Sequence, residues 1–394
     1  MKRLAVFLDG TWNDPEDNTS VWRLKLMVAP TDRAGTEQRA FYDTGVGTRW
    51  GDRFLGGAFG KGLSKNIREA YGWLMENYAD GDEIFIFGFS RGAYTARSLA
   101  GMISQCGLLT AGAPLSIGEI FDRYAKRDRP LYHLRYLKRK GMDADFTQTE
   151  KWLLRDSKSV SIHFIGVWDT VGSLGIPFGK IPGISRKALP KHFVRPSKSF
   201  KNYVQALAID EHRKPYRPSL WTEFIPHQEG ETETEVPKEA EESEEAGSAA
   251  THHREQRWFI GAHANVGGGY KSDPLCLIPL HWIQEKAIGA AFISTAKSGW
   301  RVTSTSPRGG FLRQIPSRLY RVSRLWIRFH RKIGEPDRDV TAANGTKGKV
   351  RTVNETVDES ALKRWREDKS YRPKNLQEWQ KGPGQPFKNT RRTH

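Results

Sequence analysis

Short runs of β-branched and aromatic residues alternate with segments of helical periodicity along the first three quarters of the chain. The runs are typical of buried strands, and apolar positions repeating every three to four residues are typical of amphipathic helices. We expect strands at 2–8, 39–42, 84–87, 159–168 and 256–260. We expect helices at 63–78, 93–102, 203–210 and 277–292. This alternation predicts an α/β fold with a mainly parallel sheet and helices on both faces.

Two regions inside this pattern are less regular. Residues 108–158 are basic and contain two amphipathic stretches, around 117–127 and 130–140. Residues 173–200 are basic and rich in loop formers. We expect one α/β domain over 1–300, with these two insertions forming a helical and loop cap over the functional site.

The last quarter, 301–394, is expected to be a basic helical extension with a frayed tail. Its helical pattern places one set of apolar side chains on one face: Val322, Leu325, Trp326, Phe329 and Ile333. The opposite face carries Arg318, Arg321, Arg324, Arg328 and Arg331. Either the apolar stripe docks on the core and the arginines are solvated, or the helix lies on an anionic membrane.

Charge is unevenly distributed. The formal net charge is +18, although residues 229–245 hold nine Glu and one Lys. The acidic tract at about 229–250 has almost no large apolar residue, so we expect it to be a disordered insert. The remaining surface is strongly basic and would attract polyanions, namely nucleic acid, anionic lipid headgroups or an acidic partner.

The two cysteines are too few for a disulfide framework or a zinc cluster, and the pattern requires neither metal nor cofactor. The first apolar run is too short for a signal peptide and is followed at once by Asp9. No apolar stretch approaches the length of a membrane span. We therefore expect synthesis in the cytoplasm, with delivery to another cell or to a membrane surface left open.

The stretch 82–100 contains Gly88, Ser90 and Gly92 in a Gly-x-Ser-x-Gly arrangement between a predicted strand and a predicted helix. In that context the pattern predicts a nucleophile elbow, with the serine at the carboxyl end of a strand. The two glycines suit the close approach of backbone that such a turn requires. A tight turn without catalytic chemistry is the alternative.

A serine nucleophile needs a base and an orienting carboxylate, which in α/β-hydrolases follow it in the order acid, then histidine. Asp169 follows the strand 159–168, and His263 follows the strand 256–260. The alternative acid is Asp210. The alternative bases are His212 and His281, of which the second lies in a predicted helix.

Acyl transfer also needs donors for the developing oxyanion. The backbone N–H of Arg91, the residue after the serine, is one candidate. The second candidate is the N–H of Thr11 or Gly10, in the loop after the first strand. Alternatively, Asp9 and Thr11 only hydrogen-bond that turn.

Six motifs in this order resemble the α/β-hydrolase domain of the type VI secretion phospholipase effectors. They are FLDGTWND, FYDTGVGT, GDEIFIFGFSRGAYTARSLAG, GVWDTVGSLG, ALAIDEHR and WFIGAHANVGGGY. The resemblance covers about residues 3–290, and weaker traces continue to about 376. The sequence differs from the family pattern at Asn354, where the family usually has His. It also has Ala264–Asn265 before the glycine turn, where the family often has Ser-Asp or Ser-Asn.

Residue by residue, the resemblance implies that Ser90, Asp169 and His263 form the catalytic triad. It also implies a substrate class, because characterised members hydrolyse phospholipid acyl esters. Anionic membranes and an immunity or delivery protein are the partners it suggests.

The favoured hypothesis is therefore a metal-free serine hydrolase that cleaves acyl esters, most readily those of glycerophospholipids. The alternative is a basic protein that binds nucleic acid or a partner on a hydrolase scaffold. The sequence contains no recognised nucleic-acid-binding motif, which favours the first hypothesis.

Overall fold

The computed structural model describes most of the chain, in these ranges: 1–10, 13, 15–32, 34–45, 56–172, 196–226, 253–270, 273–292, 331–334, 337–341 and 347–381. Several expectations lie outside the described residues. They are the insertion at 173–195, the acidic insert, the helix over 318–330 and the tail after 381.

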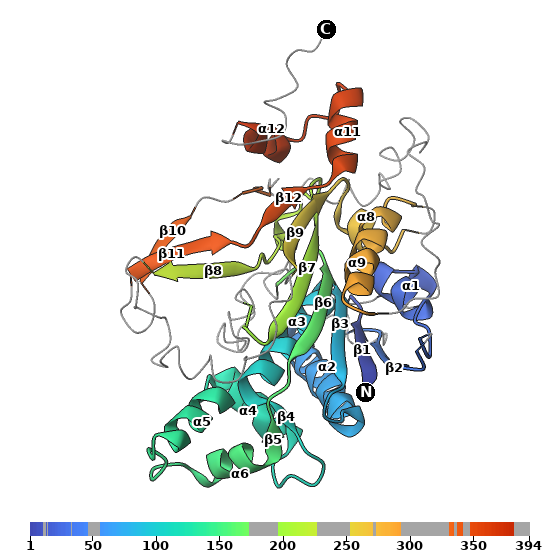
Figure 1. Cartoon of the computed structure of the whole chain (residues 1–394). Helices are drawn as coiled ribbons and strands as arrows, with labels where there is room; N and C mark the ends of the chain where they lie inside the picture. Colours follow the sequence, from blue (N-terminus) through green and yellow to red (C-terminus); the bar gives the residue numbers. More distant parts are fainter. Residues whose placement is uncertain are drawn as a thin grey trace.

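A seven-stranded sheet forms the centre of the molecule (Figure 1), in the order β12-β9-β7-β6-β3-β1-β2. All neighbouring strands in it are parallel. The strands are β1 (Lys2–Leu8), β2 (Glu37–Asp43), β3 (Glu83–Phe89), β6 (Ile162–Trp168), β7 (Phe200–Ala208), β9 (Arg254–Phe259) and β12 (Glu355–Val357). The predicted α/β-hydrolase-like fold class is confirmed. The chain reverses its direction across the sheet between β1 and β3, where open α/β sheets place their sites.

Helices cover both faces of this sheet because successive strand side chains point to opposite sides. In β1, Leu4 and Val6 belong to one core cluster, and Ala5 and Phe7 belong to the other. The first cluster is completed by α2 (Gly56–Asn77) and α3 (Arg91–Cys106). The second is completed by α1 (Ser20–Leu26) and α9 (Leu277–Gly289).

The helix expected at 203–210 is wrong, because these residues belong to strand β7. Their Ala and Leu content favours a helix in isolation. In the fold, β7 pairs with β6 on one side and β9 on the other. Tertiary pairing therefore overrides local propensity.

The described residues after 330 differ from the expected helical extension. They contain β10 (Arg338–Thr341), β11 (Lys347–Thr352) and β12, followed by α11 (Glu359–Glu367) and α12 (Lys374–Gln380). Strand β12 joins the main sheet beside β9, and β10 and β11 form an antiparallel sheet with β8 (Thr222–Pro226). The α/β unit therefore does not end at residue 300.

The helices of 108–158 do not form a cap over the carboxyl ends of the strands. They are α4 (Ile117–Lys126), α5 (Leu131–Arg139) and α6 (Gln148–Asp156), bracketed by the pair β4 (Leu108–Leu109) and β5 (Ser157–Lys158). Helix α3 runs from the carboxyl edge back to the amino edge, and β6 starts again from the amino edge. An insertion between them must therefore lie at the amino edge, at the bottom of Figure 1.

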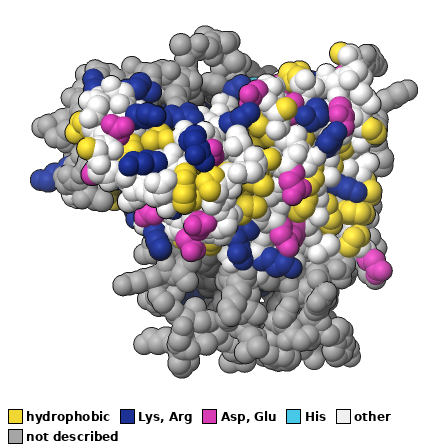
Figure 2. Space-filling view, turned by 90° about the horizontal axis from the view of Figure 1, so that it is seen from below, with side chains coloured by type: hydrophobic (Ala, Val, Ile, Leu, Met, Phe, Trp, Pro, Cys, Tyr) yellow, Lys and Arg dark blue, Asp and Glu magenta, His cyan; other side chains and the backbone are white. Residues whose placement is uncertain are grey.

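The face of the molecule that carries these helices is not uniformly basic. Viewed from below, Lys and Arg side chains are interspersed with acidic and hydrophobic ones (Figure 2). In the part of the chain that the structure describes, no helix combines the length and hydropathy needed to cross a membrane.

Candidate active site

The Gly-x-Ser-x-Gly segment forms a sharp turn from β3 into α3. Ser90, between them, has φ 59° and ψ −120°, a backbone conformation that is strained for a residue with a side chain. The flanking glycines are required sterically. A Cβ on Gly92 would lie 2.1 Å from Leu8 O, and one on Gly88 would lie 2.6 Å from Gly92 O.

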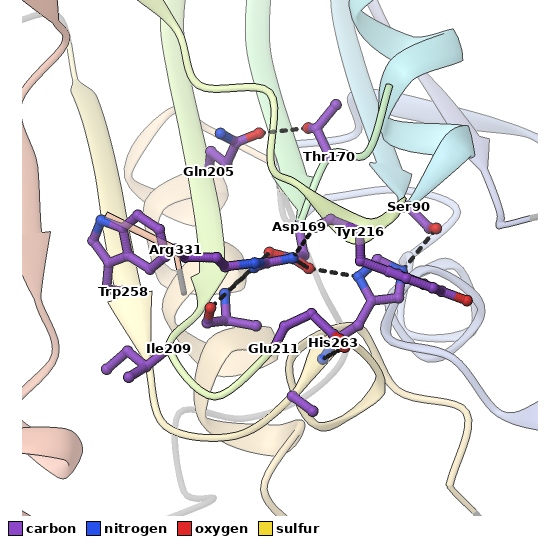
Figure 3. A network of polar contacts seen from close by, with 12 residues as sticks. Ser90, Asp169, Thr170, Gln205, Ile209, Glu211, Tyr216, Trp258, His263 and Arg331 are labelled. Atoms are coloured by element: carbon purple, nitrogen blue, oxygen red, sulfur yellow. Dashed lines mark hydrogen bonds and ion pairs between the residues drawn. The ribbon is translucent and has the colours of Figure 1, made fainter. Parts of the chain in front are cut away.

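The structure brings Ser90, Asp169 and His263 together (Figure 3). Asp169 directly follows β6, and His263 begins the short helix α8 (His263–Gly267) after β9. His263 Nε2 lies 2.8 Å from Ser90 Oγ, and His263 Nδ1 lies 2.5 Å from Asp169 Oδ2. The meeting point follows from topology, because the carboxyl ends of parallel strands share one edge of the sheet. This hydroxyl–imidazole–carboxylate series can pass a proton from oxygen to nitrogen.

Burial sets the protonation of this group. Burial lowers the pKa of His263, and although the hydrogen bond and charge of Asp169 raise it, the net shift is downward. The imidazole is therefore neutral at neutral pH and able to accept a proton. Burial raises the pKa of Asp169, but the charge of Arg331 and the hydrogen bond with His263 outweigh it, so this carboxyl stays ionised.

Arg331 is a site residue that sequence reasoning missed. Its guanidinium contacts both oxygens of Asp169, with Nη1 2.5 Å from Oδ1 and Nη2 2.8 Å from Oδ2. The expectation of a solvated or membrane-facing arginine is wrong for this residue, because only 1% of it is exposed. Nothing in the local sequence distinguishes Arg331 from its basic neighbours.

A second ion pair lies beside the histidine, in which Glu211 is buried and Arg213 is partly exposed. Glu211 Oε2 accepts a hydrogen bond from the backbone N–H of His263 at 3.3 Å. Arg213 donates to both carboxylate oxygens of Glu211, at 2.8 and 2.6 Å. Burial raises the pKa of Glu211, but the hydrogen bond and charge of Arg213 lower it by more, so Glu211 is ionised.

Two aromatic rings contact the imidazole. The ring centroid of Phe89 lies 4.7 Å from that of His263, and the centroid of Tyr216 lies 4.8 Å away in an edge-on arrangement. Phe89 is itself packed against Gly267, where a Cβ would lie 1.9 Å from its ring. These contacts leave the imidazole little freedom to turn away from Ser90.

The alternative acid and one alternative base have other partners. Asp210 accepts hydrogen bonds from Gly261 N at 2.8 Å and from Tyr371 Oη at 3.1 Å, which ties two loops together. His281 lies within α9, with Nδ1 3.6 Å from Glu285. The imidazole that contacts Ser90 Oγ is that of His263.

The predicted oxyanion donors are placed only in part. Arg91 is the first residue of α3, where the helix dipole favours negative charge. Gly10 adjoins the serine, since a Cβ on Gly10 would lie 3.3 Å from Ser90 Cβ. However, the Gly10 N–H donates to Asp9 Oδ1 at 2.7 Å, so it already has an acceptor. Thr11 lies outside the described residues.

Asp9 is a buried carboxyl beside the site. Besides Gly10, it accepts hydrogen bonds from Thr19 Oγ1 at 2.5 Å and Tyr42 Oη at 3.0 Å. Burial raises its pKa to about 6, against the opposing effect of these hydrogen bonds. Among the described residues there is no cluster of three or more His, Cys, Asp or Glu suited to a metal ion.

Comparison with known proteins identifies the family. The model of the type VI secretion phospholipase effector Tle1-like catalytic domain matches residues 2–286. The chain belongs to this Tle1-like family. The match includes Ser90, Asp169 and His263, whereas Arg331 lies beyond its end.

Individual relatives of this Tle1-like chain are distant. The uncharacterized protein YEL023C of Saccharomyces cerevisiae (strain ATCC 204508 / S288c) is 29% identical over 242 residues, covering 56% of this chain and 33% of that protein. The chain thus spans a third of the length of that relative. Two of the solved structures that match have low TM-scores. The Tle1 effector bound to the VgrG spike has TM-score 0.33 and 18% identity, covering 70% of this chain and 52% of that one. Thermogutta terrifontis esterase 2 has TM-score 0.33 and 13% identity, covering 74% and 84%.

Proposed function

We propose that this chain is a serine hydrolase that cleaves acyl esters, with glycerophospholipids as its substrates. The observation that carries the proposal is the hydrogen-bonded series from Ser90 through His263 to Asp169 at the carboxyl edge of the sheet. The membership of a family described as phospholipase effectors supports the choice of substrate.

In the proposed reaction, Ser90 Oγ attacks the ester carbonyl carbon while His263 Nε2 takes the hydroxyl proton. The resulting imidazolium is stabilised by Asp169 through Nδ1. His263 then gives the proton to the oxygen of the leaving alcohol, and the acyl group stays on Ser90. A water molecule, deprotonated by His263, hydrolyses that acyl-enzyme and restores the serine.

The negative charge that develops on the carbonyl oxygen needs backbone donors. We assign one to the N–H of Arg91, at the start of α3. The Gly10 N–H already donates to Asp9, so we assign the second donor to the N–H of Thr11. We propose that the hydrogen bond from Gly10 to Asp9 holds the turn after β1 in place.

Partners and location follow the same proposal. The substrate would be reached at an anionic membrane surface, to which the net charge of +18 would attract the protein. By analogy with the Tle1 effector bound to the VgrG spike, a delivery protein is the partner that we predict.

The test is Ser90→Ala, assayed on short-chain esters and on mixed phospholipid vesicles with mass spectrometry of the products. We expect hydrolysis to fall by at least about 10³-fold. The temperature of unfolding should stay the same or rise, because alanine keeps the small side chain and only the hydroxyl is removed.

Retained hydrolysis by Ser90→Ala would contradict the assignment. If the wild-type protein instead binds DNA or RNA with a steep salt dependence and hydrolyses no ester, the alternative of a nucleic-acid-binding protein on a hydrolase scaffold is favoured.

A further inference from the structure

The carboxylate of Asp169 is held by more than the histidine. Its Oδ1 accepts hydrogen bonds from Ala208 N at 3.0 Å and Arg331 Nη1 at 2.5 Å. Its Oδ2 faces His263 Nδ1 at 2.5 Å and Arg331 Nη2 at 2.8 Å. Arg331 therefore contributes one of the two contacts at each oxygen (Figure 3).

We propose that Arg331 is a positioning residue for the reaction, whose forked contact holds the Asp169 carboxylate with Oδ2 directed at His263. The inference rests on the proposed function and deepens it. The planar guanidinium matches a carboxylate with two parallel hydrogen bonds, which a single ammonium group cannot do. Rotation of the Asp169 carboxylate would break both of these bonds as well as the bond from Ala208.

The guanidinium is itself fixed by the protein. Nη1 also donates to Ala208 O at 2.9 Å, and Nη2 also donates to Tyr216 O at 2.5 Å. The first carbonyl belongs to the end of β7. The second belongs to the residue whose ring contacts His263. The Arg331 side chain thus links Asp169 to the end of β7 and to Tyr216, whose ring contacts His263.

The C-terminal segment that carries Arg331 is docked on the same strand ends. Asn375 Nδ2 donates to Ile209 O at 2.8 Å, and Tyr371 Oη donates to Asp210 at 3.1 Å. Ile333 packs in a core cluster whose other members come from the carboxyl ends of β7 and β9 and from residues 361–376: Leu207, Ile209, Trp258, Ile260, Ala361, Tyr371 and Leu376. The family match ends at residue 286, so a chain cut there would lack this cation.

The ion pair between Arg331 and Asp169 also changes the net charge around His263. The charged groups that face His263 are Asp169, Glu211 and Arg331, and Arg213 balances Glu211. The other neighbours are Ser90 and the rings of Phe89 and Tyr216. The charges of the two carboxylates and the two guanidiniums cancel while the imidazole is neutral, although Arg213 is partly exposed to solvent. Removing Arg331 would leave a net negative charge, which would attract a proton to the Asp169–His263 pair.

The experiment replaces Arg331 in the full chain by Gln and by Lys and measures ester hydrolysis across pH. For Arg331→Gln we expect kcat to fall about 10- to 100-fold, as when other groups that orient a reacting residue are lost. We expect KM to stay within about twofold, because the ester does not touch the guanidinium. The acid limb of the pH profile should move up by about one pH unit, because the nearby positive charge is gone.

In Arg331→Lys the acid limb should move back part of the way toward its wild-type position. Lysine returns the positive charge but cannot form the two parallel hydrogen bonds of the guanidinium. A matched control is Arg97→Gln. Arg97 is a buried arginine whose guanidinium donates to the backbone oxygens of Ser219, at 2.6 Å, and Leu220, at 3.4 Å. Its loss should lower the unfolding temperature without moving the acid limb.

A second readout requires no substrate. The ¹⁵N resonances of His263, assigned with His263→Gln, are followed against pH in the wild type and in both Arg331 variants. A proton bound at higher pH in Arg331→Gln supports the proposal even if no ester is hydrolysed, in which case only the proposed function fails. An unchanged pH profile and an unchanged His263 titration in folded Arg331→Gln would overturn the proposal. If Arg331→Gln does not fold, Arg331→Lys decides through kcat, because lysine keeps the charge but loses the forked contact. An unchanged kcat in folded Arg331→Lys would then overturn the proposal.

Discussion

The two edges of the central sheet differ in the burial of their ion pairs and in the backbone conformation of their residues. At the carboxyl edge, Ser90 and Asp169 have positive φ angles of 59° and 41°, and Asp169 forms an ion pair with Arg331 in which neither side chain is exposed. The amino edge also has ion pairs that are largely exposed, such as Lys158–Asp80, with 41% and 78% of the side chains exposed. Two capping boxes start helices there, at Ser116 and Thr147.

The residues at the amino edge therefore contribute to stability, whereas those at the carboxyl edge form the proposed active site. The amino edge follows local rules, with helix caps and exposed ion pairs that each contribute little and cost little. The carboxyl edge breaks those rules with strained backbone and buried ions, which persist only because the surrounding core enforces them. Substitutions at the two edges should therefore have different signatures.

The largest effect is expected from Gly92→Ala at the carboxyl edge. The added Cβ would meet the backbone oxygens of Leu8 and Asp9, at 2.1 and 2.3 Å, and strand β1 cannot move without disturbing its neighbours. We expect a loss of about 3 kcal/mol or more in the free energy of unfolding. Urea denaturation would measure it.

The matched substitution at the amino edge is Gly118→Ala, in the first turn of α4. Its Cβ would meet only Ser116 Oγ, at 3.7 Å. Stability should stay the same or rise by about 0.5–1 kcal/mol, because alanine favours the helix. Equal losses in the free energy of unfolding from Gly92→Ala and Gly118→Ala would contradict the proposed difference between the edges.

A smaller effect, visible only as a pH dependence, is expected at Asp9. Its pKa in the folded protein, about 6, exceeds the unfolded value of 3.8, so the folded state binds the extra proton. This contribution to stability is complete below about pH 4 and is lost as pH rises through about 6, by an amount on the order of 3 kcal/mol.

Asp9→Asn removes the titration but keeps the acceptor for Gly10, and the hydroxyls of Thr19 and Tyr42 can accept from the new amide. The difference in stability between Asp9→Asn and the wild type should therefore grow in favour of the variant from pH 4 to pH 7. Thermal unfolding of both proteins across this range is the measurement. A constant difference would show that Asp9 does not titrate there.

The smallest effect is expected from Glu119→Ala in the amino-edge helices. Glu119 completes the capping box of α4 and accepts from Ser116 N at 2.8 Å and from Ser116 Oγ at 2.7 Å, at an exposed position. Its loss should lower the free energy of unfolding by a small but measurable amount, as for other caps, and leave kcat unchanged. Arg155→Ala, which removes an exposed pair with Asp156, is the control and should change neither quantity measurably. A fall in kcat for folded Glu119→Ala would mean that the two edges are coupled.

Several features of this protein were predictable from sequence because their physical cause is local. The strand before Ser90, the two glycines beside it and the helix after it are adjacent in the chain, so their order alone indicates the turn. The positions of Asp169 and His263 after strands 159–168 and 256–260 also predict proximity, because parallel strands end at one edge.

Other features were decided only by the tertiary structure. Strand β7 resembles a helix in composition, and its pairing with β6 and β9 decides its conformation. The helices of 108–158 lie at the amino edge because α3 returns the chain there, which no side-chain pattern records. Arg331 is one of several similar arginines in a basic segment. It becomes a partner of Asp169 because the C-terminal segment docks on β7 and β9, and burial then makes that one cation the counterpart of a buried carboxylate.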